Sequence, residues 1–198
     1  MIPRYTREKI EKIWSLENKF SLWLKIEILV VEKLSINGII PKKAAEDIKK
    51  NAFFNAKEIE AIEKETKHDF VSFINNVSSY IGKNAKYFHY GVTSSDVIDT
   101  AQSLQMIEAA ELLLNEVASL RDTLRLKATE YKNTLMMGRT HGIHAEPTTF
   151  GLKLAIWWDE MNRQAQRLEA VRAQVAVGKI SGAVGTHATV PPDVETRV

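Results

Sequence analysis

Three short strings of the sequence each combine a histidine with hydroxyl or cationic side chains. They are Thr66-Lys67-His68-Asp69, His89-Tyr90-Gly91-Val92-Thr93-Ser94-Ser95-Asp96 and Gly138-Arg139-Thr140-His141. Histidine donates or accepts a proton near neutral pH, because its unperturbed pKa is about 6.5. Lysine, arginine and hydroxyl groups bind carboxylate or phosphate oxygens, as do the free backbone N–H groups at a helix start. The strings therefore predict proton transfer on a polyanionic ligand.

Simpler roles exist for the same residues. Any single histidine also fits a hydrogen-bonded structural side chain, and Thr93 with Asp96 fits helix capping. His141 and His144, with Glu146 beyond them, are of the types that supply nitrogen and oxygen ligands to a metal. No further ligand follows at a characteristic spacing, so we expect no metal site.

The composition narrows the class of protein. The chain of 198 residues carries 27 Lys and Arg against 25 Asp and Glu, and a net charge of +2 is too balanced for a protein whose main partner is nucleic acid. The absence of Cys excludes disulfides, thiolate zinc sites and a cysteine nucleophile, and it fits a cytoplasmic protein. No uncharged stretch approaches the ~18 apolar residues of a membrane span. The amino-terminal residues also lack the apolar core of a signal peptide, so we expect no membrane partner.

Helices dominate the expected secondary structure. Pro is absent between Pro41 and Pro147, which favours long helices. Apolar residues at three- and four-residue spacing predict helices over about 7–36, from Pro41 onward for a short stretch, and over about 56–82, 94–132 and 147–178. The last of these is expected to begin at Pro147, after a polar loop over 138–146. We expect no strand, and no regular element beyond Pro192.

The two longest predicted helices carry the apolar spacing of a helical bundle. A helix of about 39 residues over 94–132 would be about 58 Å long, which is longer than a compact domain of this size needs. Such a helix packs against partners along its length, including helices of other chains. Apolar residues around 113–124 and 150–168 would otherwise be exposed, so we expect the protein to self-associate.

The three strings resemble landmarks of the adenylosuccinate lyases, a branch of the fumarase/aspartase superfamily. Two further strings share the resemblance, Pro3-Arg4-Tyr5 and the continuous stretch from Met136 to Gly151. All occur in the family's order and span essentially the whole chain. The resemblance implies an all-α fold, with a small helical amino-terminal domain over 1–92 that carries substrate-binding residues. The start of a long-helix bundle domain of the fumarase/aspartase type, truncated, would follow over 93–198.

The resemblance also implies an activity. The family forms homotetramers, in which the middle domains build a central bundle and three subunits contribute to each active site. The reaction is a β-elimination that releases fumarate from adenylosuccinate, giving AMP, and from the succinylated carboxamide intermediate of purine synthesis, without a cofactor. Matching positions give His141 as general acid, His68 as its partner near the phosphate and leaving group, and Arg4 and Tyr5 at the phosphate. Further matching positions touch the substrate: Lys67, Asp69, Thr93, Ser94, Thr140 and, as a site residue, His89. His144 and His187 receive no role.

One landmark of the superfamily is missing. The mobile loop of the form Ser-Ser-x-Met-Pro-x-Lys-x-Asn, which carries the catalytic base, does not occur in the 198 residues. We therefore expect this chain to be the amino-terminal portion of a longer enzyme and to have little or no activity alone. Three alternatives stay open: a non-catalytic helical interaction module, a metal-binding helical protein, and a sibling lyase acting on argininosuccinate, aspartate or malate. Competition by AMP distinguishes the nucleotide branch from its siblings.

Overall fold

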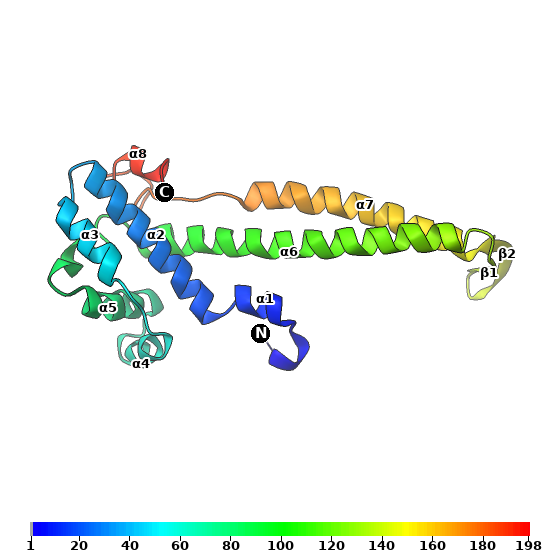
Figure 1. Ribbon diagram of the computed structural model, residues 1–198, viewed down its shortest axis with the longest axis horizontal. Helices are drawn as coiled ribbons and strands as arrows, with labels where there is room; N and C mark the ends of the chain where they lie inside the picture. The colour runs from blue at the N-terminus through cyan, green and yellow to red at the C-terminus, as the bar shows by residue number, and fades with distance from the viewer. Residues whose placement is uncertain (1) are drawn as a thin grey trace. The chain divides into compact units, whose positions relative to one another are not determined.

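The computed structural model describes residues 2–198, which form two compact units (Figure 1). The first unit contains the chain up to Met106 together with Ala176–Val198, and the second contains Ile107–Val175. Helix α6 (Ser94–Glu130) begins in the first unit and ends in the second.

Short helices joined by tight turns make up the first unit. In chain order they are η1 (Pro3–Tyr5), α1 (Glu8–Ile13), α2 (Leu16–Ile36), α3 (Lys42–Asn51), α4 (Ala56–Thr66), α5 (Asp69–Ile81), η2 (Gly82–Tyr87), the start of α6, and α8 (Pro192–Glu195). Side-chain caps fix several helix starts. The Ser15 hydroxyl accepts the Asn18 N–H at 3.1 Å, and the Asn55 side chain accepts the N–H groups of Lys57 and Glu58.

Aromatic rings on α2 and α5 form the centre of the first unit's core. Trp23 packs with its ring centroid 4.8 Å from that of Phe70 and 5.4 Å from that of Phe73. All three side chains are almost completely buried, and Phe20 adds a further edge contact to Trp23. Such ring pairs stabilise the fold by more than their buried area alone provides. The packing of α2 against α5 therefore fixes the positions from which the following loops start.

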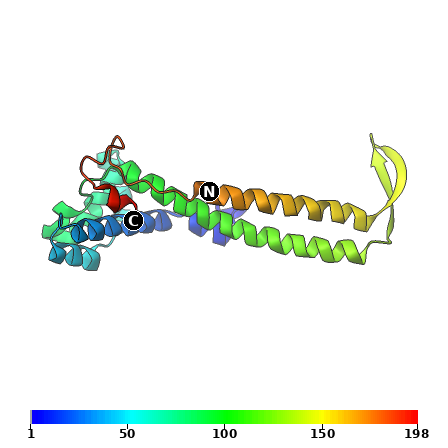
Figure 2. The ribbon, with the colours of Figure 1, turned by 90° about the horizontal axis from the view of Figure 1, so that it is seen from above.

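The second unit is a helical hairpin with a β-hairpin at its tip. The later part of α6 and helix α7 (Phe150–Val175) run side by side in both ribbon views (Figures 1 and 2). An ion pair between Arg172 and Glu111 joins them at 3.0 Å. Near the β-hairpin, the backbones of α6 and α7 lie very close together. A Cβ added to Gly151 on α7 would lie 2.5 Å from the carbonyl oxygen of Ala128 on α6. Only glycine fits this position.

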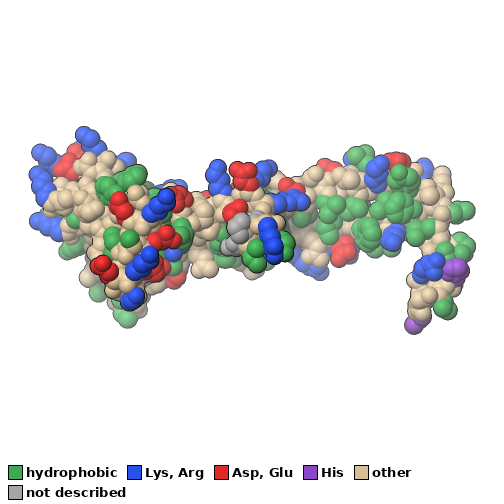
Figure 3. Space-filling model, turned by 90° about the horizontal axis from the view of Figure 1, so that it is seen from below, with side chains coloured by type: hydrophobic (Ala, Val, Ile, Leu, Met, Phe, Trp, Pro, Cys, Tyr) green, Lys and Arg blue, Asp and Glu red, His purple; other side chains and the backbone are tan. Residues whose placement is uncertain are grey.

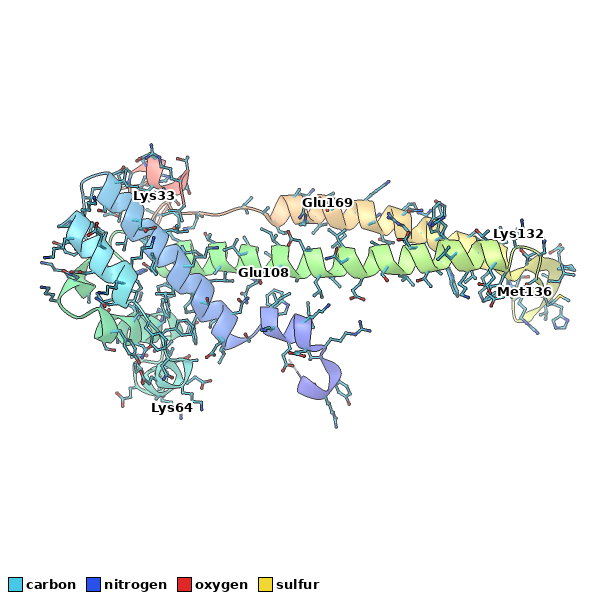
Figure 4. The ribbon with its side chains drawn as sticks, in the orientation of Figure 1. Lys33, Lys64, Glu108, Lys132, Met136 and Glu169 are labelled. Atoms are coloured by element: carbon cyan, nitrogen blue, oxygen red, sulfur yellow. The ribbon has the colours of Figure 1, made fainter. Side chains whose placement is uncertain are left out.

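Strands β1 (Leu135–Thr140) and β2 (Ile143–Thr149) pair in antiparallel fashion between the two long helices. Lys132 and Met136, labelled in Figure 4, mark the passage from α6 into the hairpin. His141 and Gly142 form its two-residue turn, both with positive φ (50° and 74°). This is the backbone of a type I′ turn, whose twist matches that of the flanking strands.

The helical class and the long helices expected from the sequence are confirmed. The expected cap of α6 is also confirmed, because the Thr93 N–H donates to the Asp96 carboxylate at 2.9 Å. The expectation of no strand is wrong for 135–149. Pro147 lies within β2 rather than at a helix start, and α7 begins at Phe150.

Three further expectations need correction. The helix predicted over 7–36 is divided at Trp14 and Ser15, where the Ser15 cap starts α2. The helix predicted over 56–82 is divided at Lys67, whose left-handed backbone ends α4. A four-residue helix, α8, follows Pro191, and its Val194 is buried in the core of the first unit. The domain division expected between residues 92 and 93 stays a prediction.

Among residues 2–198, no helix combines the length and apolar character that crossing a membrane requires.

Candidate functional site

The turn between α4 and α5 brings Lys67, His68 and Asp69 to one surface. Lys67 adopts the left-handed conformation (φ 54°) and ends α4 through its N–H bond to the Glu63 carbonyl. His68 is the N-cap of α5, and its Nδ1 accepts the Val71 N–H at 3.4 Å. Because Nδ1 serves as this acceptor, Nε2 is the ring nitrogen that remains for a ligand.

Hydroxyl groups hold the backbone of this turn. The Ser72 hydroxyl donates to the His68 carbonyl at 2.7 Å and lies 2.6 Å from the Thr66 hydroxyl. Thr66 also accepts the His68 N–H at 3.3 Å. The turn is therefore braced on both sides, although the His68 side chain itself is 51% exposed.

An open pocket of about 580 Å³ lies beside the turn. Its lining residues are Leu16, Lys19, Phe20, Glu60, Glu63, Lys67, His68 and Asp69. Lys19 lies 3.5 Å from the Asp69 carboxylate and 4.4 Å from the centroid of the Trp23 ring. The Lys19 ammonium is thus held by an aromatic face as well as by a carboxylate. Together with Lys67, it places two ammonium groups in a lining that also contains the carboxylates of Glu60, Glu63 and Asp69.

The start of α6 carries Thr93 and Ser94, and Asp96 fixes it. The Asp96 side chain is fully buried and accepts hydrogen bonds from four donors. These are the Thr93 N–H (2.9 Å), the Lys179 ammonium (2.6 Å), the Ser181 N–H (3.2 Å) and the Gly182 N–H (3.1 Å). Asp96 therefore ties the segment that carries Thr93 and Ser94 to the segment 179–182, far away in the sequence.

His89 is held by Glu27, a residue that the sequence analysis did not identify. The Glu27 carboxylate on α2 is fully buried and lies 2.6 Å from Nδ1 of His89. Burial raises the pKa of the Glu27 carboxyl above its usual value, the hydrogen bonds and charge of His89 oppose that rise, and nearby Asp96 adds to it. The ring of His89 also lies against Phe70, with centroids 5.0 Å apart. His89 therefore contacts residues of both α2 and α5.

In the second unit, Thr140 and His141 lie at the tip of the β-hairpin. Thr140 pairs with Ile143 across the turn, and His141 occupies the first turn position. Both side chains are exposed. A histidine at this position projects from two paired strands, so its backbone is better defined than in the irregular loop that the sequence predicted for 138–146.

Arg4 and Tyr5 lie in η1, where the Arg4 guanidinium sits 4.7 Å from the centroid of the Tyr5 ring. Within the described part of the chain, no hydrogen bond joins either side chain to the other candidate residues. The structure thus brings Lys67, His68 and Asp69 together around one pocket. The roles of all ten candidates stay predictions.

The sequence left open that the chain is a metal-binding helical protein. Among the residues that the structure describes, no group of three or more His, Asp or Glu side chains could hold a metal ion. His141 and His144 do lie on the same hairpin, with His144 opposite Arg139 in the strand register.

The helical fold is shared with a class of lyases. A family model described as "Lyase" matches residues 4–198, and the chain belongs to this lyase family, within the fumarase/aspartase superfamily. The particular relatives are more specific. The chain is 48% identical over all 198 residues to adenylosuccinate lyase of Bacillus subtilis and 47% identical to adenylosuccinate lyase of Staphylococcus saprophyticus, covering 46% of each.

Solved structures show the same fold. A fumarate lyase from Mesorhizobium matches with a TM-score of 0.90 and 30% identity, over 98% of this chain and 47% of that one. A β-carboxy-cis,cis-muconate cycloisomerase from Acinetobacter calcoaceticus matches with a TM-score of 0.85 and 28% identity, over 92% of this chain and 44% of that one. The chain thus spans about half the length of the relatives it matches.

Proposed function

We propose that this chain forms part of an adenylosuccinate lyase, a carbon–nitrogen lyase of purine and AMP biosynthesis. The reaction is a β-elimination that gives AMP and fumarate from adenylosuccinate, and fumarate from the succinylaminoimidazole carboxamide ribotide. The observation that carries the proposal is the 48% identity to an adenylosuccinate lyase, which extends over all 198 residues.

In this proposal, proton transfer and anion binding are divided among the candidates. His141 is the general acid that protonates the departing nitrogen, and His68 acts beside it near the phosphate and leaving group. Arg4 and Tyr5 bind the phosphate. The remaining contacts to the substrate come from Lys67, Asp69, His89, Thr93, Ser94 and Thr140. No cofactor or metal takes part, and nucleic acid and membranes are not partners.

The site must stabilise a carbanion next to a carboxylate. Fixed donors aimed at developing charge often contribute more to catalysis than any other effect, and one such donor contributes about 3 kcal/mol. Thr93 and Ser94 suit this role because their hydroxyl groups lie at the amino-terminal end of α6, and a helix start favours an anion. The buried Asp96 keeps that turn in place.

We further propose a cytoplasmic homotetramer. Apolar side chains gather over the helices of the second unit, as Figure 3 shows for one face. On α6 and α7 the large ones that are exposed are Leu113, Leu120, Leu126, Leu152, Ile156, Trp157 and Val171. A patch of this kind favours association with further helices. Light scattering of the full-length protein should therefore give an oligomer, and a monodisperse monomer would contradict the proposal.

Residues 1–198 on their own should release little or no fumarate, because the Ser-rich string of the superfamily's catalytic base does not occur among them. The full-length protein should release fumarate from adenylosuccinate, measured by absorbance, and AMP should compete for the site. Robust turnover by the 198-residue chain would disprove the first expectation. Turnover of argininosuccinate, aspartate or malate without competition by AMP would instead favour a sibling lyase.

A further inference from the structure

Glu27 and His89 form a largely buried contact in the first unit. The proposed function gives His89 a contact to the substrate but gives Glu27 no role. Glu27 exposes 0% of its side chain, whereas the His89 side chain is 24% exposed. The two oxygens of the carboxylate accept two different groups of the same residue. Oε1 lies 2.6 Å from Nδ1 of the ring, and Oε2 accepts the backbone N–H at 3.2 Å.

These two bonds fix both the backbone and the ring of His89. Its φ of 59° lies in the left-handed region, which is uncommon for a residue with a side chain. The bond from its N–H to Glu27 stabilises that conformation, and the Phe70 ring supports one side of the imidazole. Over residues 2–198, Nε2 of His89 has no hydrogen-bond partner. The exposed part of the ring is therefore available to a ligand through Nε2.

The proposal concerns the state in which Glu27 and His89 together carry two protons. When the pair carries two protons, one lies between Oε1 and Nδ1 and the other is on Nε2, whichever atom the shared proton is bonded to. This arrangement leaves the buried pair with no net charge, which lowers the cost of burying the carboxylate. An Nε2–H group at the surface of the unit then suits an anionic oxygen.

We propose that Glu27 is a positioning residue, which holds His89 so that its Nε2–H donates to an anionic oxygen of the substrate, phosphate or carboxylate. The proposal rests on the proposed function for the identity of that substrate. A packing role alone does not explain a carboxylate here, since Glu27 lies on α2 among buried apolar side chains such as Trp23 and Val30. An apolar residue would fill the same space without the cost of desolvation.

The test is a double-mutant cycle in the full-length protein with Glu27→Met and His89→Ala. Met has a similar length but no oxygen, so it replaces neither the bond to the ring nor the bond to the backbone N–H of His89. Glu27→Met should lower kcat/KM for adenylosuccinate by about tenfold or more, the size expected for one charge-assisted hydrogen bond. In the His89→Ala background, the same substitution should change kcat/KM little, because no ring is left to position. Full additivity of the two substitutions would overturn the proposal.

Separate titrations with AMP and with fumarate identify the anionic group. Weaker binding of AMP in Glu27→Met assigns Nε2 to the nucleotide phosphate, and weaker binding of fumarate alone assigns it to a carboxylate. Unchanged binding of both, with unchanged kcat/KM, would overturn the proposal.

Asn76→Ala is the matched control, because Asn76 is also buried and polar but its side chain bonds to Asn55 and Glu58 rather than to a candidate site residue. It should lower stability without changing kcat/KM.

A readout independent of turnover separates this proposal from the proposed function. Diethyl pyrocarbonate modifies the unprotonated, accessible nitrogen of imidazole, and mass spectrometry resolves each modified histidine. His89 should react faster in Glu27→Met than in the wild type, because Glu27 no longer holds either ring nitrogen in place. Asn76→Ala should leave the rate unchanged. A wild-type protein that neither releases fumarate nor binds AMP would contradict the proposed function, and an unchanged His89 rate in Glu27→Met would overturn the positioning role.

Discussion

The His141→Asn variant of the full-length protein should release fumarate from adenylosuccinate about 100- to 10,000-fold more slowly than the wild type, the usual contribution of a positioned general acid. Asn cannot supply a proton to the departing nitrogen. It does accept the left-handed conformation that His141 adopts (φ 50°), and Asn-Gly is a preferred pair for a type I′ turn. The substitution therefore removes the acid and keeps the hairpin.

His144→Asn is the control for this prediction. His144 lies on β2 of the same hairpin and is also exposed, but it has no assigned role. The turnover of the His144→Asn variant should stay close to the wild-type value. Both variants should unfold thermally at the same temperature as the wild type. Wild-type turnover in His141→Asn would remove His141 from the acid role. An equal loss in both variants would instead indicate that the hairpin as a whole, rather than one imidazole, is required.

The hairpin shows where sequence spacing was insufficient. Its strands have only six and seven residues, too short for periodicity to separate a strand from a loop. Pro147 favoured a helix start, yet it sits in β2 opposite Met137, where a two-stranded sheet tolerates a residue without an N–H. The pair His141-Gly142 between Thr140 and Ile143 was the available indication of a two-residue turn.

The break between α4 and α5 had weaker indications. No Gly or Pro marks it, and Lys67 takes the left-handed conformation that Gly usually provides. His68 caps α5 with a ring nitrogen rather than with a Ser, Thr, Asp or Asn oxygen. By contrast, the start of α6 was predictable, because Thr93 and Asp96 have the types and the spacing of a reciprocal cap.

Glu27 shows the limit for the site itself. A charged residue four positions after Trp23 and three before Val30 lies within an apolar stripe, and this alone could have marked it as a buried polar group. Its partner could not have been predicted from local spacing, because His89 is 62 residues away. The same holds for the pairing of Lys179 with Asp96 across 83 residues. The cap of α6 was thus predictable because its residues lie within one helix turn. The partners of Glu27 and Asp96 were not predictable, because they lie far away in the sequence.

Asp96→Ala should lower the free energy of unfolding by about 3–5 kcal/mol, the loss expected when one member of a buried, hydrogen-bonded charge pair is removed. The Lys179 ammonium can turn toward water, because its side chain is 39% exposed, so the ion pair itself contributes the smaller part. The N–H groups of Ser181 and Gly182 cannot do so, since Asp96 accepts both within a buried region. Each buried N–H group without an acceptor costs about 1–3 kcal/mol.

Two further variants separate these contributions in urea unfolding. Lys179→Met removes the cation but leaves the buried Asp96 carboxylate with three backbone donors, so its loss should be clearly smaller than that of Asp96→Ala. Asp99→Ala, one turn along α6 at an exposed position, should change stability by no more than about 0.5 kcal/mol. Amide hydrogen exchange at Ser181 and Gly182 should accelerate strongly in Asp96→Ala and little in Lys179→Met. If Lys179→Met were as destabilising as Asp96→Ala, the ion pair rather than the backbone acceptors would hold segment 179–182 to the start of α6.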